Sequence, residues 1–238
     1  MKTIKQFVMI AILTLAATGC MEDFTVHGNG ISVSQGRPVA AFDKVKSSGD
    51  FEVHITKGDE YDVLVNAEET LQPYIETYVS GNTLHIDVEG WHNLKNRLPM
   101  KVYVTVPALT SIKQSGSGTI STAHFTAGKY ELFVSGSGNI STSVDAGIVE
   151  AAVSGSGSII ISGNSGDVFY AISGSGGIDS YELEAENCEA NISGSGNMRV
   201  LVTETLIAKI SGSGNIYYYG NPQVNYNISG SGKVINEN

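Results

Sequence analysis

One short motif recurs at nearly constant spacing through the second half of this chain. The tetrapeptide Ser-Gly-Ser-Gly occurs seven times, and its copies begin at Ser115, Ser135, Ser154, Ser173, Ser193, Ser211 and Ser229. The intervals between successive copies are 20, 19, 19, 20, 18 and 18 residues. Repeats of this length are typical of a solenoid, in which each repeat forms one coil and stacks on the next.

Apolar residues flank every copy at alternate positions, and a flexible Gly/Ser linker would have no need of that pattern. The residue directly before the motif is Val or Ile in six of the seven copies, and the residue five after its first Ser is Ile, Met or Val in all seven. Alternation of this kind directs one face of a strand into a core. The sequence therefore predicts an all-β fold, a right-handed parallel β-solenoid with coils of about 19 residues and two or three short strands per turn.

The same alternation of inward and outward positions predicts how the residues of the motif itself are oriented. Both glycines should face inward, where a narrow coil leaves no space for a side chain. Both serines should face outward and stack from coil to coil about 4.8 Å apart, which lets their hydroxyl groups form a ladder.

The region before the repeats, residues 39–110, is also rich in strand patterns. Two hairpins are expected, one joining 51–56 to 62–65 and one joining 74–79 to 83–88. Met100 begins a strongly alternating strand that Pro107 ends, and Asn66 could cap a short helix.

Residues 47–50, Ser-Ser-Gly-Asp, look like a degenerate copy of the motif. We therefore expect residues 39–110 to form hairpin-rich, wider N-terminal coils that cover the end of the coils formed by residues 111–234. Residues 235–238 are a short C-terminal tail.

The N-terminus has the pattern of an export signal. Lys2 and Lys5 precede an uncharged stretch that is too short to span a bilayer and that ends on Ala16-Ala17-Thr18-Gly19-Cys20. Small residues before a Cys resemble the bacterial lipobox, although Ala17 stands where that motif usually has Leu. We expect residues 1–19 to be a lipoprotein signal peptide, Cys20 to carry lipid, and residues 20–38 to form a tether. An ordinary cleaved signal is the alternative.

Composition excludes one class of partner. Removal of residues 1–19 leaves 12 basic and 24 acidic residues, a net charge of −12, with no run of Lys or Arg. Nucleic acid is therefore not an expected partner, and the lipid on Cys20 should be the contact with the membrane. The other cysteine, Cys188, falls in an apolar column and should be a buried free thiol.

No established catalytic motif is found, and no cofactor or metal is expected. Glu131 and Glu150 should share an outward column about 5 Å apart, a separation that a retaining glycosidase also uses. Phe169 follows them in that column, and no basic residue accompanies them in the coil pattern, so a solvated acidic face is the preferred interpretation. His54 and His85 fall on outward positions and are interpreted as surface histidines rather than a metal pair.

Two aromatic features are candidates for ligand binding. Trp91, the only tryptophan, lies in a loop between strands. An exposed indole there would suit stacking on a sugar, but the preferred interpretation is a loop anchor packed on the solenoid end. Tyr217 and Tyr219, with Tyr218 between them and Tyr226 in the neighbouring core column, form an aromatic patch in the last coils.

The repeats, together with Phe42-Asp43-Lys44-Val45, the strand Gly49–Val53 and the strand Leu84–Ile86, resemble the head GIN domain family of "putative auto-transporter adhesins". That family is common among secreted proteins and lipoproteins of the Bacteroides group. The resemblance covers residues 39–234 and implies a β-solenoid-like fold, an adhesive role and no established catalytic residues.

The preferred interpretation is a non-catalytic cell-envelope lipoprotein, an adhesin that presents its solenoid to a glycan or to a host or cell-surface protein. We expect it on the outer membrane, exposed at the cell surface because Glu22 and Asp23 follow Cys20, with a periplasm-facing protein as the alternative. Two other classes stay open. One is a polysaccharide-acting enzyme that uses Glu131 and Glu150, and the other is a structural protein that associates end to end with itself.

Overall fold

The structure is a computed structural model that describes residues 24–238. The predicted signal peptide and the proposed lipidation site at Cys20 lie outside the described residues. Within residues 24–238 no helix is long and apolar enough to cross a membrane.

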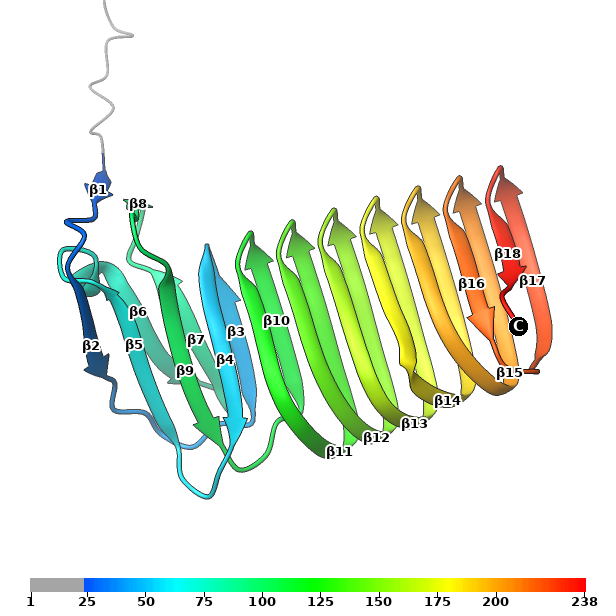
Figure 1. The fold of residues 1–238 in the computed structure, drawn as a ribbon, viewed down its shortest axis with the longest axis horizontal. Coiled ribbons are helices and arrows are strands. Elements are labelled where there is room, and N and C mark those ends of the chain that lie inside the picture. The colour runs from blue at the N-terminus through cyan, green and yellow to red at the C-terminus, as the bar shows by residue number, and fades with distance from the viewer. Residues whose placement is uncertain (1–23) are drawn as a thin grey trace, which may run out of the picture.

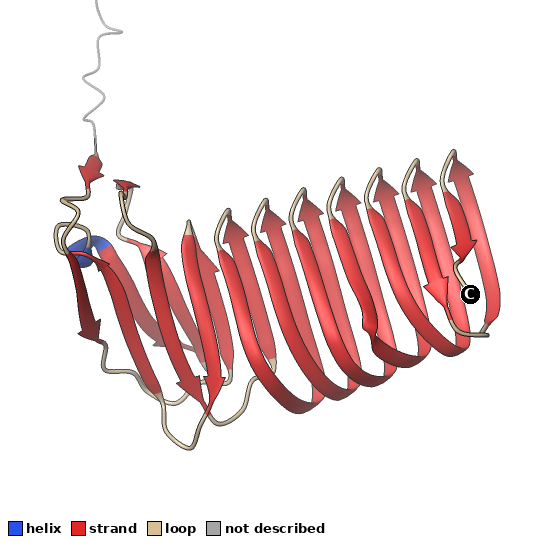
Figure 2. Ribbon diagram, viewed as in Figure 1, coloured by secondary structure: helices blue, strands red, loops and turns tan. Residues whose placement is uncertain are grey.

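The chain forms a two-walled β-solenoid whose coils stack along one axis (Figure 1). The chain descends along the near wall, returns along the far wall and advances from left to right, which makes the coils right-handed (Figure 1). The regular coils are the long bent strands β11 (Thr119–Gly136), β12 (Asn139–Gly155), β13 (Ser158–Gly174), β14 (Gly177–Gly194) and β15 (Asn197–Gly212). Strands make up nearly all of the fold, and the only helix among the described residues is the short 3-10 turn η2 (Gln72–Tyr74) (Figure 2).

Each coil has two straight segments joined by a bend. The number of strands per turn is therefore two, the lower of the two values predicted from the sequence. We call the far wall, whose strands lead into the motif, wall A. It contains β6 (Ile75–Ser80), β7 (Thr83–Val88), β3 (Lys44–Ser48), β10 (Ser111–Gly116), the later halves of β11 to β15, and β17 (Gln223–Gly230).

We call the near wall, whose strands leave the motif, wall B. It contains β2 (Ser32–Gly36), β5 (Asp62–Glu68), β9 (Met100–Val106), β4 (Phe51–Lys57), the early halves of β11 to β15, β16 (Asn215–Tyr219) and β18 (Lys233–Asn236). Two further short strands, β1 (Thr25–His27) and β8 (Asn93–Lys95), pair with each other at the N-terminal end.

The Ser-Gly-Ser-Gly motifs occupy the same corner of successive coils, as predicted. Ser115 pairs with Ser135, Ser135 with Ser154, and the register continues without a shift to Ser229. Ser48 pairs with Ser115, and Gly49 has φ of 122° like the first motif glycines, so the predicted degenerate first copy is present. It occupies residues 48–51, one position later than the predicted 47–50.

The expectation that both glycines face inward was wrong for the first of them. The second glycine is buried, for example Gly138, but the first glycine lies at the corner with φ between 98° and 132° in all seven copies. A Cβ on Gly155 would point at the carbonyl oxygen of Gly136 in the preceding coil, at 2.5 Å. That oxygen accepts hydrogen bonds from two amides of the next motif, Ser156 at 2.9 Å and Gly157 at 3.0 Å. Glycine is therefore required by backbone conformation and by coil-to-coil contact rather than by the core.

The N-terminal coils differ from the predicted hairpins in one respect. β6 and β7 pair antiparallel, as expected, but β4 and β5 do not pair with each other. Strand β9 lies between them, parallel to β4 and antiparallel to β5. Its buried Val102 and Val104 are in register with buried Val or Ile residues of both strands, so β9 continues the apolar face on either side. Asn66 belongs to β5 and caps no helix.

The interior is a continuous apolar core that runs the length of the solenoid. Its largest fully buried side chains include Phe51, Phe125, Tyr130 and Tyr170. Cys188 is buried in register with Val168 and Leu206, so the predicted inward column is confirmed.

Candidate binding surfaces

A long outward-facing row of side chains crosses wall A two residues before the motif corner. The pairing places in one line His85, Lys46, Lys113, Phe133, Ala152, Ala171, Asn191, Lys209 and Asn227. The middle of this row, together with the neighbouring row of first motif serines, lines an open groove of about 780 Å³.

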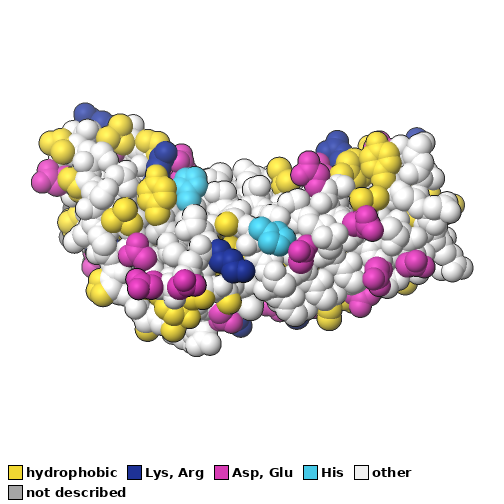
Figure 3. All heavy atoms as spheres, turned by 60° about the horizontal axis from the view of Figure 1, so that its bottom comes forward, with side chains coloured by type: hydrophobic (Ala, Val, Ile, Leu, Met, Phe, Trp, Pro, Cys, Tyr) yellow, Lys and Arg dark blue, Asp and Glu magenta, His cyan; other side chains and the backbone are white. Residues whose placement is uncertain are grey.

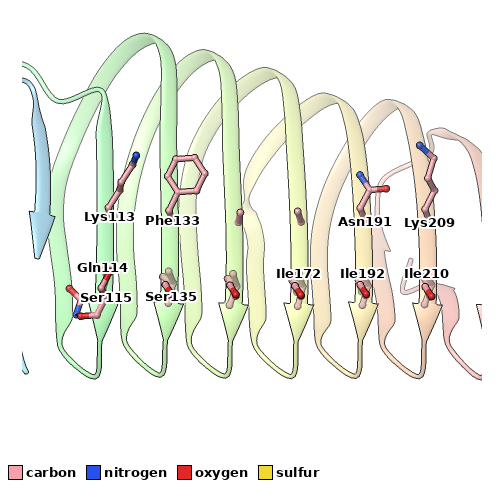
Figure 4. A pocket seen from close by; sticks show the side chains of 18 of the residues that line it. Lys113, Gln114, Ser115, Phe133, Ser135, Ile172, Asn191, Ile192, Lys209 and Ile210 are labelled. Atoms are coloured by element: carbon pink, nitrogen blue, oxygen red, sulfur yellow. The ribbon is translucent and has the colours of Figure 1, made fainter. Parts of the chain in front are cut away.

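The groove exists because side-chain size varies along the row. Lys113 and Phe133 stand at one end and Asn191 and Lys209 at the other, with only short side chains between them (Figure 4). Those short residues are Ala152 and Ala171. The floor is therefore apolar, and its volume lies within the range of about 300–1,000 Å³ that is usual for ligand sites.

Basic side chains mark the N-terminal end of the groove. Lys46 and Lys113 are register neighbours, and Lys44 lies two residues before Lys46 on the same strand. Lys113 Nζ lies 5.0 Å from the centre of the Phe133 ring. Among residues 24–238, no carboxylate lies within 4.0 Å of the Lys46 or Lys113 ammonium group. The sequence predicted no basic patch, and this group was missed because Lys46 and Lys113 are far apart in the chain.

The predicted pair of carboxylates lies on wall A, as the groove does, four residues before the motif. Glu131 and Glu150 are direct register partners, and Phe169 follows Glu150. The expectation that no basic residue accompanies them was wrong, since Lys129 Nζ lies 2.9 Å from Glu131 and 3.0 Å from Glu150. Lys129 is two residues before Glu131, so it points the same way from the strand, and the coil pattern could have shown it.

The electrostatics of this pair differ from those of a glycosidase acid. The hydrogen bond from Lys129 lowers the pKa of Glu131 and outweighs the effect of its partial burial. Hydrogen bonds to Glu131 and Glu150 in turn raise the pKa of Lys129. A general acid for glycoside cleavage needs a raised pKa, so Glu131 is shifted in the opposite direction.

The two outward histidines lie on different walls. His54 on wall B contacts Ser121, with 2.8 Å between Nδ1 and Oγ, and stacks on Tyr103. His85 on wall A stacks on Tyr78, with ring centres 4.7 Å apart. In the part of the chain that the structure describes, no three His, Cys, Asp or Glu side chains gather in a way that could hold a metal ion.

The predicted aromatic candidates lie at opposite ends of the molecule, so the structure does not bring them together. Trp91 follows β7 at the N-terminal end and is 90% exposed, so the expectation that it anchors its loop was wrong. Tyr217 and Tyr219 lie on β16 at the C-terminal end. Tyr219 packs on Tyr181, with ring centres 4.8 Å apart, while Tyr217 lies beside the guanidinium group of Arg199.

Figure 3 brings the bend edge between the two walls toward the viewer. Asp and Glu side chains are spread over the face in view, with few Lys or Arg side chains among them. The outline of the molecule dips between its two ends (Figure 3). Asp145 on this side pairs with His124 at 3.2 Å and accepts a hydrogen bond from Asn164.

Comparison with known families gives a match over residues 41–222, more than half of the chain, to the family described as "Putative auto-transporter adhesin, head GIN domain". The chain belongs to this family. The resemblance inferred from the repeats and the early strands is thereby confirmed. Family membership indicates an adhesin-like protein of the cell surface or envelope. Among curated proteins, none matches this chain.

Several crystal structures share the fold. A putative adhesin from Bacteroides fragilis is 21% identical, with a TM-score of 0.83 over 89% of this chain and 99% of that one. A putative adhesin from Parabacteroides distasonis is 28% identical, with a TM-score of 0.73 over 89% and 99%. A third structure, from Parabacteroides distasonis and described as a "putative lipid binding protein", is 24% identical, with a TM-score of 0.78 over 90% and 100%.

Proposed function

We propose that this chain is a non-catalytic binding protein of the cell envelope, anchored by lipid on Cys20, and that the groove on wall A binds a long-chain fatty acid. One observation carries the proposal. An apolar floor of Ala152 and Ala171 runs from a basic end at Lys46 and Lys113, in a chain whose overall charge is −10. An elongated apolar floor with positive charge at one end is complementary to an amphiphile that has an apolar tail and an anionic head group.

The dimensions of the groove support this ligand class. Lys113 and Lys209 are separated by five strand spacings, about 24 Å at about 4.8 Å each. A fatty-acid chain could lie along the floor with its carboxylate at Lys46 and Lys113. Each methylene group of the fatty acid that leaves water contributes about 0.8 kcal/mol to the free energy of binding. Even partial burial of the fatty-acid tail would therefore give measurable affinity.

The two ends of the groove differ in how their lysines are paired, and this difference decides which way round the fatty acid lies. Lys209 Nζ lies 3.0 Å from Glu189 Oε1, and its charge is already balanced by that carboxylate. The ammonium groups of Lys46 and Lys113 form no ion pair within 4.0 Å among the described residues. We therefore place the carboxylate of the ligand at the N-terminal end.

The structural relative described as a "putative lipid binding protein" is consistent with this ligand class. For the location we propose the outer membrane with the solenoid at the cell surface, since the family is adhesin-like. In this arrangement the lipid anchor holds the protein and the two walls stay free to meet ligands.

The test is equilibrium dialysis of radiolabelled palmitate with the full chain carrying Cys20→Ser, which removes the proposed lipidation site. Ala171→Phe places a ring on the exposed groove floor and should abolish binding. Ser141→Phe, an equally exposed strand position on wall B, is the matched control and should bind as the parent does.

A second pair of variants tests the head group. Lys46→Gln with Lys113→Gln should weaken palmitate binding at least tenfold and leave binding of the uncharged hexadecanol nearly unchanged. Lys57→Gln with Lys233→Gln is the control for overall charge, because it also removes two positive charges and both lysines are exposed residues on wall B. Absence of palmitate binding by the parent chain, or equal binding by Ala171→Phe, would refute the proposal.

A further inference from the structure

A second row of side chains, on wall B directly after the motif corner, is interrupted at one position. Its register partners are Thr119, Asn139, Ser158, Gly177, Asn197, Asn215 and Lys233. The row is a polar ladder. Asn139 Oδ1 accepts from the Ser158 hydroxyl at 2.7 Å, and Asn197 Oδ1 accepts from the Asn215 amide at 3.0 Å. At Gly177 the ladder has no side chain.

Gly177 is not required by the backbone, unlike the glycines of the motif. Its φ lies outside the left-handed region, and the only atom within 4 Å of an added Cβ is the Asn197 carbonyl oxygen, at 3.6 Å. An added Cβ on the neighbouring Gly176 would collide with the backbone of Gly157. A side chain would therefore fit at position 177, and its absence leaves a hollow of about 410 Å³.

The hollow is lined by groups of mixed chemistry. The adjoining outward row contributes Ile160, Asp179, Arg199 and Tyr217, which are successive register partners. Arg199 Nη1 lies 3.3 Å from Asp179 Oδ2, and the Arg199 guanidinium carbon lies 5.9 Å from the centre of the Tyr217 ring. Ile160 is 52% exposed. Ser156 and Ser175 of the motif corner and Asn197 of the next coil also line the hollow.

We propose that this hollow binds one pyranose ring of a neutral saccharide. The Asp179–Arg199 pair fixes an acceptor and a planar donor side by side, which suits the adjacent hydroxyl groups of a sugar. Tyr217, one register step from Arg199, supplies apolar surface for the C–H face of the ring. The opposite charges of the pair cancel, so the hollow has no net charge that would favour an ionic ligand. The site is separate from the groove on wall A and needs none of its residues.

The test uses the full chain carrying Cys20→Ser and neutral oligosaccharides that end in glucose, galactose, mannose or N-acetylglucosamine. Binding is measured by ligand-observed saturation-transfer NMR, with an expected Kd of about 0.1–1 mM for at least one of them. Gly177→Asn restores the interrupted ladder and fills the hollow, so it should abolish this binding. Gly128→Asn is the matched control, since Gly128 is an exposed glycine with nothing within 4 Å of an added Cβ.

A second variant covers the case in which Gly177→Asn fails to fold. Arg199 is on the surface, so Arg199→Gln should keep the fold and reduce saccharide affinity at least tenfold. Both variants should bind palmitate as the parent does, which separates this site from the groove. The proposal is overturned if no neutral oligosaccharide binds at about 10 mM, a level that would reveal even very weak sites. It is also overturned if the folded Gly177→Asn or Arg199→Gln variant binds as tightly as the parent.

Discussion

Replacement of Gly194 by alanine tests the requirement for glycine at the first motif position. Gly194 has φ of 131°, a conformation that residues with a Cβ rarely adopt. An added Cβ would also lie against the carbonyl oxygen of Gly174 and 3.1 Å from its carbonyl carbon and its nitrogen. The neighbouring atoms are backbone, so they cannot move without disturbing the pairing of β13 and β14.

The two costs can be added to an order of magnitude. A residue held in a sparsely populated backbone region costs about 1–3 kcal/mol, and overpacking against fixed atoms costs a further 1–3 kcal/mol or so. Gly194→Ala should therefore lower the free energy of unfolding by about 2–6 kcal/mol. The lower bound alone corresponds to a fall in Tm of about 4–8 °C for a chain of this size.

Gly177→Ala is the matched control, since it adds the same methyl group one coil corner away without a positive φ or a close contact. Its Tm should stay within about 2–4 °C of the parent, equivalent to roughly 1 kcal/mol. Circular dichroism thermal melts of the three proteins measure the difference. Equal melting temperatures for Gly194→Ala and Gly177→Ala would show that neither backbone conformation nor corner contact determines stability here.

Four further predictions concern single residues. Burial raises the pKa of the Cys188 thiol, so a maleimide should label it only after denaturation, and rapid labelling at neutral pH would contradict the inward column. Cys20→Ala should move the protein from the membrane fraction to the soluble fraction without changing its Tm, whereas retention on membranes would indicate another contact. Burial by itself would raise the pKa of Glu68, but backbone amides of Arg97, Leu98 and Gly30, with the Arg97 charge, lower it below its ordinary value of 4.5. The ionised form of Glu68 thus stabilises the fold above pH 4.5, and this stabilisation is lost as the pH falls through the lower pKa that Glu68 has in the folded protein. Glu68→Gln should therefore lower Tm at neutral pH but much less under acid conditions. Trp91→Ala should leave Tm unchanged because the indole is 90% exposed, and a sharp fall would mean that it packs on the solenoid end.

The repeats determined the regular coils almost completely. Their spacing and alternation predicted a parallel solenoid, the shared corner at Ser115 to Ser229 and the burial of Cys188, because each coil repeats the same local environment. The N-terminal part was harder. Strand β9 separates β4 from β5, a choice between competing long-range partners that local pattern does not encode.

The candidate surfaces depended still more on tertiary structure. Parity alone placed Glu131 beside Glu150, since both follow the same repeat. The groove required Lys46 of an irregular coil to lie beside Lys113 of a regular one, and the hollow required knowing that Gly177 has an ordinary φ and free space around its Cα. A motif glycine and Gly177 are the same letter in the sequence. Only the backbone conformation and the distance to the next coil show that one glycine is needed for stacking and the other opens a site.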